Sequence, residues 1–334
     1  MSRVVRWGVL GCARVFERRM VPAFGKVEDA SLDAVASRDA AKAASTAQRH
    51  GIGRSYGSYE ELLADPEIDA VYVPLPNDLH ARWVVAALEA GKHVLCDKPM
   101  VLSVEDAVRC RDAASARGLR LMEGFMYRHH PQHARVRRLM AEGAIGRPVR
   151  MAGCFAYAAT PDHAGIRWDP ARGGGALADV GVYPVDAARM LFDAEPVSVF
   201  CAGTIDRETG VDVHADGILA FPGGRTATFS CGFDQAFTSR YEIVGSEGSI
   251  EAVRAFQVGE AGVALRVRTG GVDTVVEEEF PHVDHWAEEI RHFGECVRDS
   301  AKPLAPGEDG VAQARVLAAL RRSMVSGRQE EVVA

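Results

Sequence analysis

The first 125 residues alternate between short apolar runs and longer amphipathic stretches. The short runs have the length and burial pattern of strands inside a sheet, and the stretches between them are typical of helices. Strands are predicted at 4–10, 32–36, 70–73, 93–96 and 119–122, and helices at 18–26, 40–50, 59–64, 79–90 and 104–117. Regular alternation of this kind predicts right-handed β-α-β units and a doubly wound, Rossmann-type parallel sheet.

The pattern changes after about residue 124. A helix is predicted at 131–142 and an extended segment at 148–157, followed by alternating apolar and polar residues from about 198 to 265. Gly223-Gly224, between two alternating runs, predicts a hairpin turn. Helices are expected near 285–300 and 309–325. The sequence thus predicts an α/β chain with a Rossmann domain at 1–123 and an α+β domain with a large, open, mainly antiparallel sheet at 124–334.

Composition narrows the class of protein without defining its chemistry. The 334 residues are 47% hydrophobic and 25% charged, which is ordinary for a globular protein. A net charge of −7 without a long basic run argues against nucleic acid or an anionic membrane as partner. No apolar run approaches the length of a membrane span, and the N-terminus leads directly into a predicted strand. The seven cysteines are scattered without a C-x-x-C pair, so reduced thiols and a cytoplasmic location are expected.

A glycine-containing turn follows the first predicted strand. Such a turn lets a phosphate approach the backbone and the N-terminus of the next helix. The turn departs from the G-x-G-x-x-G pattern, because Ala13 and Phe16 hold the second and third glycine positions after Gly11. Its place on the first strand of a doubly wound domain nevertheless predicts cofactor binding by the run Gly11, Cys12, Ala13, Arg14 and Val15.

The end of the second strand bears on the choice between NAD and NADP. An acidic residue there accepts hydrogen bonds from the adenosine ribose of NAD, whereas a hydroxyl and a cation favour the 2′-phosphate of NADP. Here the strand is followed by Ser37 and Arg38, and Asp39 lies beyond the usual position of an NAD-binding acid. The sequence therefore predicts NADP in preference to NAD; a solvated surface role for Arg38 is the alternative.

Three further motifs are more specific. They are the segment from Ala70 through Pro76-Asn77-Asp78-Leu79-His80, the segment Ala90-Gly91-Lys92-His93-Val94-Leu95-Cys96-Asp97-Lys98-Pro99, and Gly173-Gly174-Gly175 leading into Asp179 and Tyr183. With them the chain resembles, over nearly its whole length, the glucose–fructose oxidoreductase / inositol dehydrogenase / MocA (Gfo/Idh/MocA) family. Asp97-Lys98-Pro99 replaces that family's Glu-Lys-Pro. Tyr183 stands where many members have histidine, which resembles the branch of sugar-nucleotide 3-ketoreductases and of aldose and dihydrodiol dehydrogenases.

The resemblance implies a catalytic set of Lys98, Tyr183 and Asp179, and their chemistry agrees with it. Lys98 directly follows the fourth predicted strand, at the sheet edge where doubly wound folds bind ligands. Asp179 and Tyr183 are four residues apart and would share one face of a helix. A tyrosine hydroxyl can donate a proton to a developing alkoxide, and a nearby ammonium stabilises its ionised form. Tyr183 is the expected general acid in reduction, with Lys98 as electrostatic partner and Asp179 as orienting acceptor. Whether Lys98 or Tyr183 delivers the proton stays open.

The resemblance also implies further contacts. Matching family positions place Pro74, Leu75, Asn77, His80 and Asp97, with Lys98, along the cofactor; for His80 a structural role is an equal alternative. Arg167, Trp168 and Tyr127 are candidates for lining the substrate pocket. No metal is expected, because the histidine-rich strings 129–133 and 282–285 lack acidic or cysteine partners at the spacing of a metal site.

Together these features predict an NAD(P)-dependent oxidoreductase acting on CH–OH groups of a small-molecule sugar. The favoured substrate is a nucleotide sugar or glycoside that reacts at a ring secondary alcohol or ketone. The alternative enzyme is an aldose 1-dehydrogenase or trans-dihydrodiol dehydrogenase, and a non-catalytic NADP-sensing regulator is a third possibility. Because one face of an open sheet would be left uncovered, a homodimer or homotetramer is expected.

Overall fold

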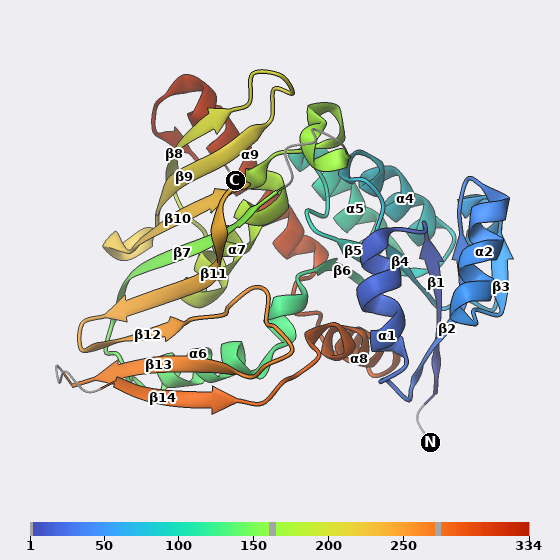
Figure 1. Cartoon of the computed structure of the whole chain (residues 1–334), viewed down its shortest axis with the longest axis horizontal. Coiled ribbons are helices and arrows are strands. Elements are labelled where there is room, and N and C mark those ends of the chain that lie inside the picture. Colours follow the sequence, from blue (N-terminus) through green and yellow to red (C-terminus); the bar gives the residue numbers. More distant parts are fainter. Residues whose placement is uncertain (1–2, 160–164, 271–274, 334) are drawn as a thin grey trace. The chain divides into compact units, whose positions relative to one another are not determined.

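A computed structural model gives the structure of residues 3–159, 165–270 and 275–333 (Figure 1). The chain folds into two compact units: unit 1 is Met1–His129 with Asp284–Val311, and unit 2 is His130–Val283 with Ala312–Ala334. The C-terminal part of the chain is thus shared between the units. The division predicted from the sequence, a cofactor-binding Rossmann domain at 1–123 and a substrate-binding α+β domain at 124–334, stays a prediction.

Unit 1 is built on a six-stranded parallel sheet with the strand order β3-β2-β1-β4-β5-β6. Its strands are β1 (Val5–Leu10), β2 (Ala30–Ala36), β3 (Arg54–Tyr56), β4 (Ala70–Val73), β5 (His93–Asp97) and β6 (Leu121–Gly124). The order reverses direction next to β1, as in a doubly wound Rossmann fold. The predicted fold class is confirmed, although the sequence pattern missed the three-residue strand β3.

The helices of unit 1 follow the prediction closely, because their ends carry clear sequence signals. Asp39, Ser58 and Ser103 cap the helices that follow them, and Gly51 and Gly118 end two of these helices in the left-handed conformation. The helical elements are η1 (Phe16–Met20), α1 (Val21–Phe24), α2 (Ala40–His50), α3 (Tyr59–Leu63), α4 (Asn77–Glu89), α5 (Val104–Arg117), η2 (Met126–His129) and α8 (His285–Arg298). The helix expected at 18–26 therefore starts earlier, and η1 is a π-helical turn.

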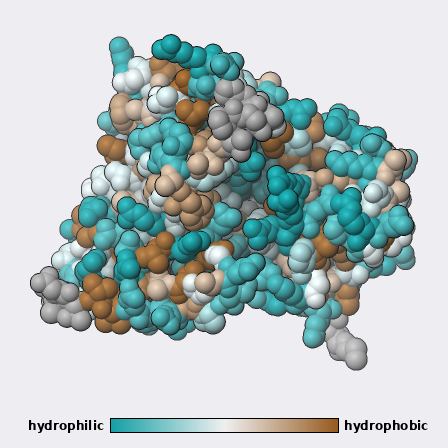
Figure 2. Space-filling view, viewed as in Figure 1, coloured by the Kyte–Doolittle hydropathy of each residue, from teal (hydrophilic) through white to brown (hydrophobic). Residues whose placement is uncertain are grey.

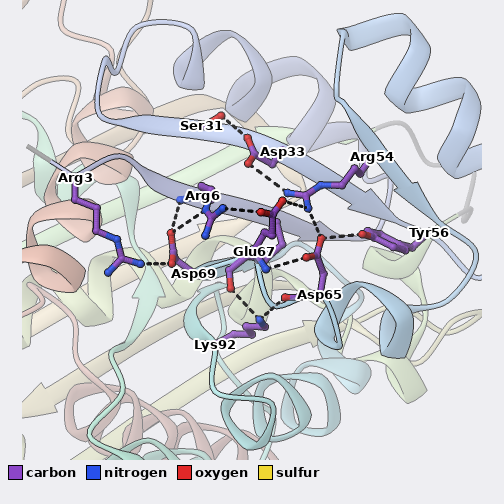
Figure 3. Close-up of polar contacts among 11 residues, drawn as sticks. Arg3, Arg6, Ser31, Asp33, Arg54, Tyr56, Asp65, Glu67, Asp69 and Lys92 are labelled. Atoms are coloured by element: carbon purple, nitrogen blue, oxygen red, sulfur yellow. Dashed lines mark hydrogen bonds and ion pairs between the residues drawn. The ribbon is translucent and has the colours of Figure 1, made fainter.

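A polar network joins the strand starts of unit 1 (Figure 3). Arg54 forms ion pairs with Asp33, Asp65 and Glu67. Lys92, 6% exposed, donates from Nζ to the backbone oxygens of Asp65 at 2.6 Å and Ile68 at 2.9 Å. Further members of the network are Arg3, Arg6, Ser31, Tyr56 and Asp69. Because Asp69 and Lys92 directly precede β4 and β5, this network lies at the amino ends of those strands, and the predicted cofactor residues follow their carboxyl ends.

Unit 2 contains a nine-stranded sheet with the order β14-β13-β12-β11-β7-β10-β9-β8-β15. β10 pairs with β7 in parallel, and the other neighbouring strands pair in antiparallel orientation. The strands are β7 (Pro148–Ala158), β8 (Ser198–Ile205), β9 (Asp212–Ala220), β10 (Thr226–Gly232), β11 (Asp234–Gly245), β12 (Gly248–Ala252), β13 (Val263–Thr269), β14 (Val275–Phe280) and β15 (Glu330–Glu331). The predicted mainly antiparallel sheet is confirmed.

The two faces of this sheet differ in their side chains. The helical elements of unit 2 are α6 (Pro131–Ala141), η3 (Ile166–Trp168), η4 (Pro170–Arg172), η5 (Leu177–Gly181), α7 (Val182–Phe192), η6 (Pro222–Gly224) and the part of α9 (Gly307–Ser326) that begins at Ala312. Strand residues alternate, with Leu219, Phe229 and Cys231 buried, and Phe200 and Ile218 exposed. The predicted hairpin forms between β9 and β10, where Gly223 and Gly224 both have positive φ.

Within the ranges that the structure describes, no helix combines the length and hydrophobicity that crossing a membrane requires. Hydrophobic and hydrophilic residues are interspersed on the face shown in Figure 2. All seven cysteines are free thiols.

Candidate active site

The turn after β1 has the geometry that close approach to the backbone requires. Gly11 has a φ of +111°, a conformation that side chains rarely adopt, and its N–H donates to the Ala36 carbonyl at 2.8 Å. A Cβ at Gly11 would lie 2.8 Å from the Leu75 side chain. The predicted residues Cys12 and Ala13 complete this turn, and Arg14 and Val15 open the helical segment that follows. A helix N-terminus beyond a glycine turn is a site where phosphate can accept backbone hydrogen bonds.

At the end of β2 the structure assigns different roles to three neighbouring residues. The Asp39 side chain accepts from the Lys42 N–H at 3.1 Å as the N-cap of α2, so this carboxylate is used within the helix. Ser37 is buried, and its hydroxyl accepts from the Asp39 N–H at 3.2 Å. Arg38 is exposed. This arrangement leaves the Arg38 cation accessible beside β2.

Tyr59 is a neighbour of this region that the sequence pattern did not single out. Its hydroxyl would lie 3.9 Å from a Cβ at Gly11, and its ring packs edge to face on Trp83 with a centroid separation of 4.7 Å. Burial raises the pKa of Tyr59, while the charge of Arg38 and a hydrogen bond to its side chain act in the opposite direction. Tyr59 therefore lies between the Gly11 turn and Arg38. A tyrosine opening a short helix carries no distinctive pattern, so sequence alone could not find it.

The loops after β4 and β5 are joined by His80. This residue is fully buried, with Nε2 2.7 Å from the Leu75 carbonyl oxygen and Nδ1 2.9 Å from that of Pro99. Both ring nitrogens thus face backbone oxygens, which is the geometry of the structural role. Burial lowers the pKa of His80.

The loop that His80 contacts carries Lys98. The Lys98 N–H donates to the Asp97 carboxylate at 3.0 Å, and the Lys98–Pro99 peptide bond is cis. Pro74 and Leu75 are buried at the end of β4, and Asn77 begins α4. The structure therefore brings the predicted cofactor residues of unit 1 to the carboxyl ends of its strands. Contact of each with a cofactor stays a prediction.

In unit 2, Asp179 is held by two donors. Tyr157 Oη lies 2.9 Å and Arg167 Nε 2.7 Å from Asp179 Oδ2. The Asp179 carboxylate raises the pKa of Arg167, and burial together with Asp179 raises the pKa of Tyr157. Tyr157 was missed by the sequence analysis, because its partner lies on another element. Asp179 is thus oriented from two sides, which fits the acceptor role expected for it.

Asp179 and Tyr183 lie on consecutive helical elements. Asp179 is in the π-helical turn η5, and Tyr183 is in the first turn of α7. The single regular helix expected from their spacing is therefore widened by a π turn, a feature found often at functional sites. Tyr183 is 4% exposed, and its ring packs against Phe155 at 5.2 Å and Phe256 at 5.8 Å between centroids. These rings fix the direction of the phenol side chain.

The three predicted substrate residues have different surroundings. Arg167 forms the ion pair with Asp179, and the Trp168 ring packs at 5.6 Å on Phe233, which in turn contacts Tyr157 at 5.5 Å. Tyr127 is 1% exposed in unit 1. Such burial is typical of a core tyrosine, and the predicted contact of Tyr127 with substrate remains untested.

The glycine run before Asp179 has a packing explanation within unit 2. A Cβ at Gly174 would lie 2.5 Å from the Arg167 carbonyl oxygen, and a Cβ at Gly175 would overlap the Asp212 carboxylate. Gly175 N–H also donates to the Arg167 carbonyl at 2.9 Å. The glycines therefore let the chain pass close to the Arg167 segment and to β9.

Comparisons with known proteins agree with this architecture. Residues 5–125 match the family described as "Oxidoreductase family, NAD-binding Rossmann fold", and residues 133–251 match the "GFO/IDH/MocA C-terminal domain". A two-domain oxidoreductase with an NAD-binding Rossmann fold is the class that fold and site define. The chain belongs to the Gfo/Idh/MocA oxidoreductase family, which confirms the resemblance noted in the sequence.

Individual relatives cover nearly the whole chain. D-Xylose 1-dehydrogenase (NADP(+)) 2 from Haloferax volcanii is 38% identical over 98% of this chain and 99% of its own. A dTDP-3,4-didehydro-2,6-dideoxy-α-D-glucose 3-reductase from Saccharopolyspora spinosa is 38% identical over 98% and 99%. A 3-ketoreductase from Actinomadura kijaniata, crystallised with NADP and TDP-benzene, has a TM-score of 0.89 and 36% identity, with 96% of this chain and 98% of that chain covered.

Proposed function

We propose that this protein is a sugar oxidoreductase that interconverts a secondary alcohol and a ketone on a nucleotide sugar or glycoside, with NADP as the preferred cofactor. The proposal is carried by the helical segment that bears Asp179 and Tyr183, where Tyr157 and Arg167 orient the Asp179 carboxylate. The similarity to a dTDP-sugar 3-reductase and to a 3-ketoreductase bound to NADP and TDP-benzene supports the substrate class.

The residues of unit 1 fit a dinucleotide phosphate. Gly11, with positive φ, and the helix N-terminus beyond it can receive the pyrophosphate. The exposed Arg38 guanidinium can receive a 2′-phosphate, and one oxygen of the Asp39 carboxylate is engaged as a helix cap. These features support NADP over NAD. When bound, the nicotinamide ring supplies or accepts the hydride.

The protein's own contribution is proton transfer and orientation. In the reducing direction, the Tyr183 hydroxyl donates its proton to the substrate oxygen as the carbonyl carbon gains the hydride, and the product is the alcohol. The Lys98 ammonium stabilises the phenolate that remains on Tyr183 and donates a hydrogen bond to the substrate. Asp179 accepts a hydrogen bond from a substrate hydroxyl and so orients the ring. In the oxidising direction the same groups act in reverse.

A substrate panel with NADP and NAD, followed by absorbance of the reduced cofactor, tests this function. The expected result is turnover of ketosugars or their alcohols with lower KM for NADP(H). Tyr183→Phe should bind cofactor normally and reduce kcat by about 100-fold or more, in the range of general acid catalysis. Wild-type turnover in Tyr183→Phe would show that the proton comes from another group, with Lys98 the first to test. Cofactor binding without turnover of any polyol or ketosugar would favour the NADP-sensing alternative.

One observation favours a second candidate activity. The D-xylose 1-dehydrogenase from Haloferax volcanii is as similar to this chain as the dTDP-sugar 3-reductase, at 38% identity each. An aldose 1-dehydrogenase would oxidise the anomeric carbon of a free sugar. Free aldoses in the same panel separate the two, since a nucleotide-sugar enzyme should prefer the nucleotide-linked substrate by at least about tenfold in kcat/KM.

We also propose that the uncovered face of the nine-stranded sheet binds a second copy of this chain. A groove of about 520 Å³ crosses this face, with Phe200 and Ile218, 39% and 47% exposed, on its lining. Beside it Arg266 pairs with Glu251 and Glu277, so both charge signs alternate across the surface. Such a surface can complement itself about a two-fold axis. Light scattering should give a dimer or tetramer, and a stable monomer would refute this part of the proposal.

A further inference from the structure

Asp212, the first residue of β9, lies against the start of the helical segment that carries Asp179 and Tyr183. The N-cap position of this segment is Ala176, which has no side chain able to accept a hydrogen bond. Asp212 supplies that acceptor from a distant part of the sequence, because its Oδ2 lies 2.6 Å from the Leu177 N–H. The carboxylate therefore caps the first turn of the segment, where backbone N–H groups lack helical partners.

The backbone beside Asp212 is shaped to receive this carboxyl group. Gly175 has a φ of +109°, and a Cβ there would overlap Asp212 Oδ1. The Gly175 carbonyl accepts from the Asp179 N–H at 3.0 Å, and the Gly175 N–H donates to Arg167 at 2.9 Å. Leu177, which Asp212 caps, is thus two residues from Asp179 and two residues from Gly175, whose N–H bonds to the Arg167 carbonyl. A shift of the carboxyl group would be transmitted directly to the Arg167–Asp179 ion pair.

The surroundings of Asp212 place its ionisation near neutral pH. Burial raises the pKa of Asp212 to about 6, against the opposing effects of the Leu177 hydrogen bond and the Arg321 guanidinium. Two thiols among the described residues also face Asp212, Cys201 on β8 and Cys231 on β10. Burial raises the pKa of both, so both are neutral. Asp216, further along β9, acts on the same two thiols. The carboxylate is accordingly ionised above pH 6 and protonated below it.

We propose that Asp212 is a positioning residue for Asp179 and Tyr183, and that protonation of its carboxylate loosens their helical segment and lowers turnover. This inference rests on the proposed function of Asp179 and Tyr183. The Leu177 hydrogen bond lowers the pKa of Asp212, so protonation of the buried carboxylate in turn weakens this hydrogen bond. Charge-assisted hydrogen bonds are about twice as strong as neutral ones.

Asp212→Asn tests the proposal, because asparagine keeps the shape and a neutral acceptor and mimics the protonated acid. The measured quantity is the ratio of kcat for wild type to kcat for Asp212→Asn between pH 5 and 8.5. We expect this ratio to be roughly ten at pH 8, which corresponds to the strengthening of one hydrogen bond by charge. The ratio should fall towards one below pH 5, with a midpoint near pH 6. Ionisations whose pKa the substitution leaves unchanged cancel in the ratio. A ratio that does not change with pH would overturn the proposal, since a purely structural residue gives that result.

Asp112→Asn is the control, because Asp112 is an exposed carboxylate on α5, outside the helical segment and the proposed interface. Its ratio should stay near one at every pH. A second readout is independent of turnover. It is the hydrogen exchange of the peptide that covers 176–183, measured in the full-length protein and corrected for the intrinsic pH dependence of exchange. Protection should fall between pH 8 and pH 5.5 in wild type and not in Asp212→Asn, with α5 as the internal reference.

The two readouts separate failure of this inference from failure of the proposed function. If the chain turns over no sugar substrate, the proposed function fails, and the exchange measurement alone decides whether Asp212 holds the segment. If turnover is found but protection of 176–183 is the same at both pH values, the inference fails and the proposed function stands. If Asp212→Asn does not fold, protection of 176–183 that is equal at both pH values in wild type still overturns the inference.

Discussion

The Tyr157 hydroxyl donates a hydrogen bond of 2.9 Å to the carboxylate of Asp179, from the end of strand β7 to the π turn η5. Arg167 donates to the same carboxylate oxygen at 2.7 Å. One oxygen of Asp179 is therefore fixed by two donors from separate segments of unit 2. Rigid placement of this kind is needed for a side chain that orients a substrate, since small displacements reduce rates strongly.

Tyr157→Phe should lower kcat by roughly tenfold and leave cofactor affinity unchanged, because it removes one of the two donors to Asp179. Steady-state kinetics and NADPH fluorescence titration measure the two quantities. Tyr56→Phe is the control, since it also removes a tyrosine–aspartate hydrogen bond, of 2.8 Å to Asp65 in unit 1. That control should lose about 1 kcal/mol of stability and keep full turnover. Equal kcat values for the two variants would contradict the role of Tyr157.

Arg38→Ala should weaken NADPH binding by about 10- to 100-fold, because the lost contact is between a guanidinium and a dianionic phosphate. NADH binding should change by less than about twofold, since NADH lacks the 2′-phosphate. Tyr59→Phe should produce a smaller loss for NADPH, because it removes the hydroxyl that bonds to Arg38. Fluorescence titration with both cofactors measures these effects.

Arg109→Ala, which removes an exposed arginine paired with Asp106 on α5, is the control for nonspecific charge effects. It should shift neither affinity by more than about twofold, as is usual for surface ion pairs. A wild-type preference for NADH, or equal losses for both cofactors in Arg38→Ala, would contradict the assignment of Arg38.

How far the sequence can lead depends on whether a feature is local. The bounds of α2 and α5 were predictable, because Asp39 and Ser103 begin these helices and Gly51 and Gly118 end them. The three-residue strand β3 was not, because it is too short to show a period. The same distinction applies to the site. Lys98 and Tyr183 stand in recognisable motifs, whereas Tyr157, Tyr59 and Asp212 acquire partners only when distant segments fold together.

Acid should destabilise the protein through His93. Burial, with a smaller effect from Arg120, lowers the pKa of His93 to about 4, and its Nδ1 accepts from the Arg120 N–H at 2.9 Å. The unfolded chain therefore binds more protons at this residue between about pH 6.5 and pH 4, so stability present above pH 6.5 is lost as the pH falls through that window. His93→Asn offers an acceptor that does not titrate. Between pH 7 and pH 4.5 we expect its free energy of unfolding to fall by about 2 kcal/mol less than that of wild type. Urea unfolding at the two pH values measures this difference, and parallel losses would contradict it.

Two lysines of unit 1 should respond to the same substitution in opposite ways. Lys92 is buried at the amino end of β5 and donates to two backbone oxygens, whereas Lys98 follows the carboxyl end of that strand. Lys92→Met leaves those oxygens without their charged donor and should cost about 2 to 4 kcal/mol in the free energy of unfolding. Turnover per folded molecule should stay within about twofold, because Lys92 lies at the amino end of β5, whereas the predicted cofactor residues follow the carboxyl ends of the strands.

Lys98→Met should give the reverse result. Its stability should change by less than about 1 kcal/mol, and kcat should fall by about 100-fold or more, because the ammonium that assists proton transfer is lost. Denaturant unfolding and steady-state kinetics on the same preparations measure both quantities. If Lys98→Met lost stability without losing turnover, Lys98 would be a structural lysine of the cis-proline loop. The proton transfer proposed for Tyr183 would then have to proceed without an ammonium partner.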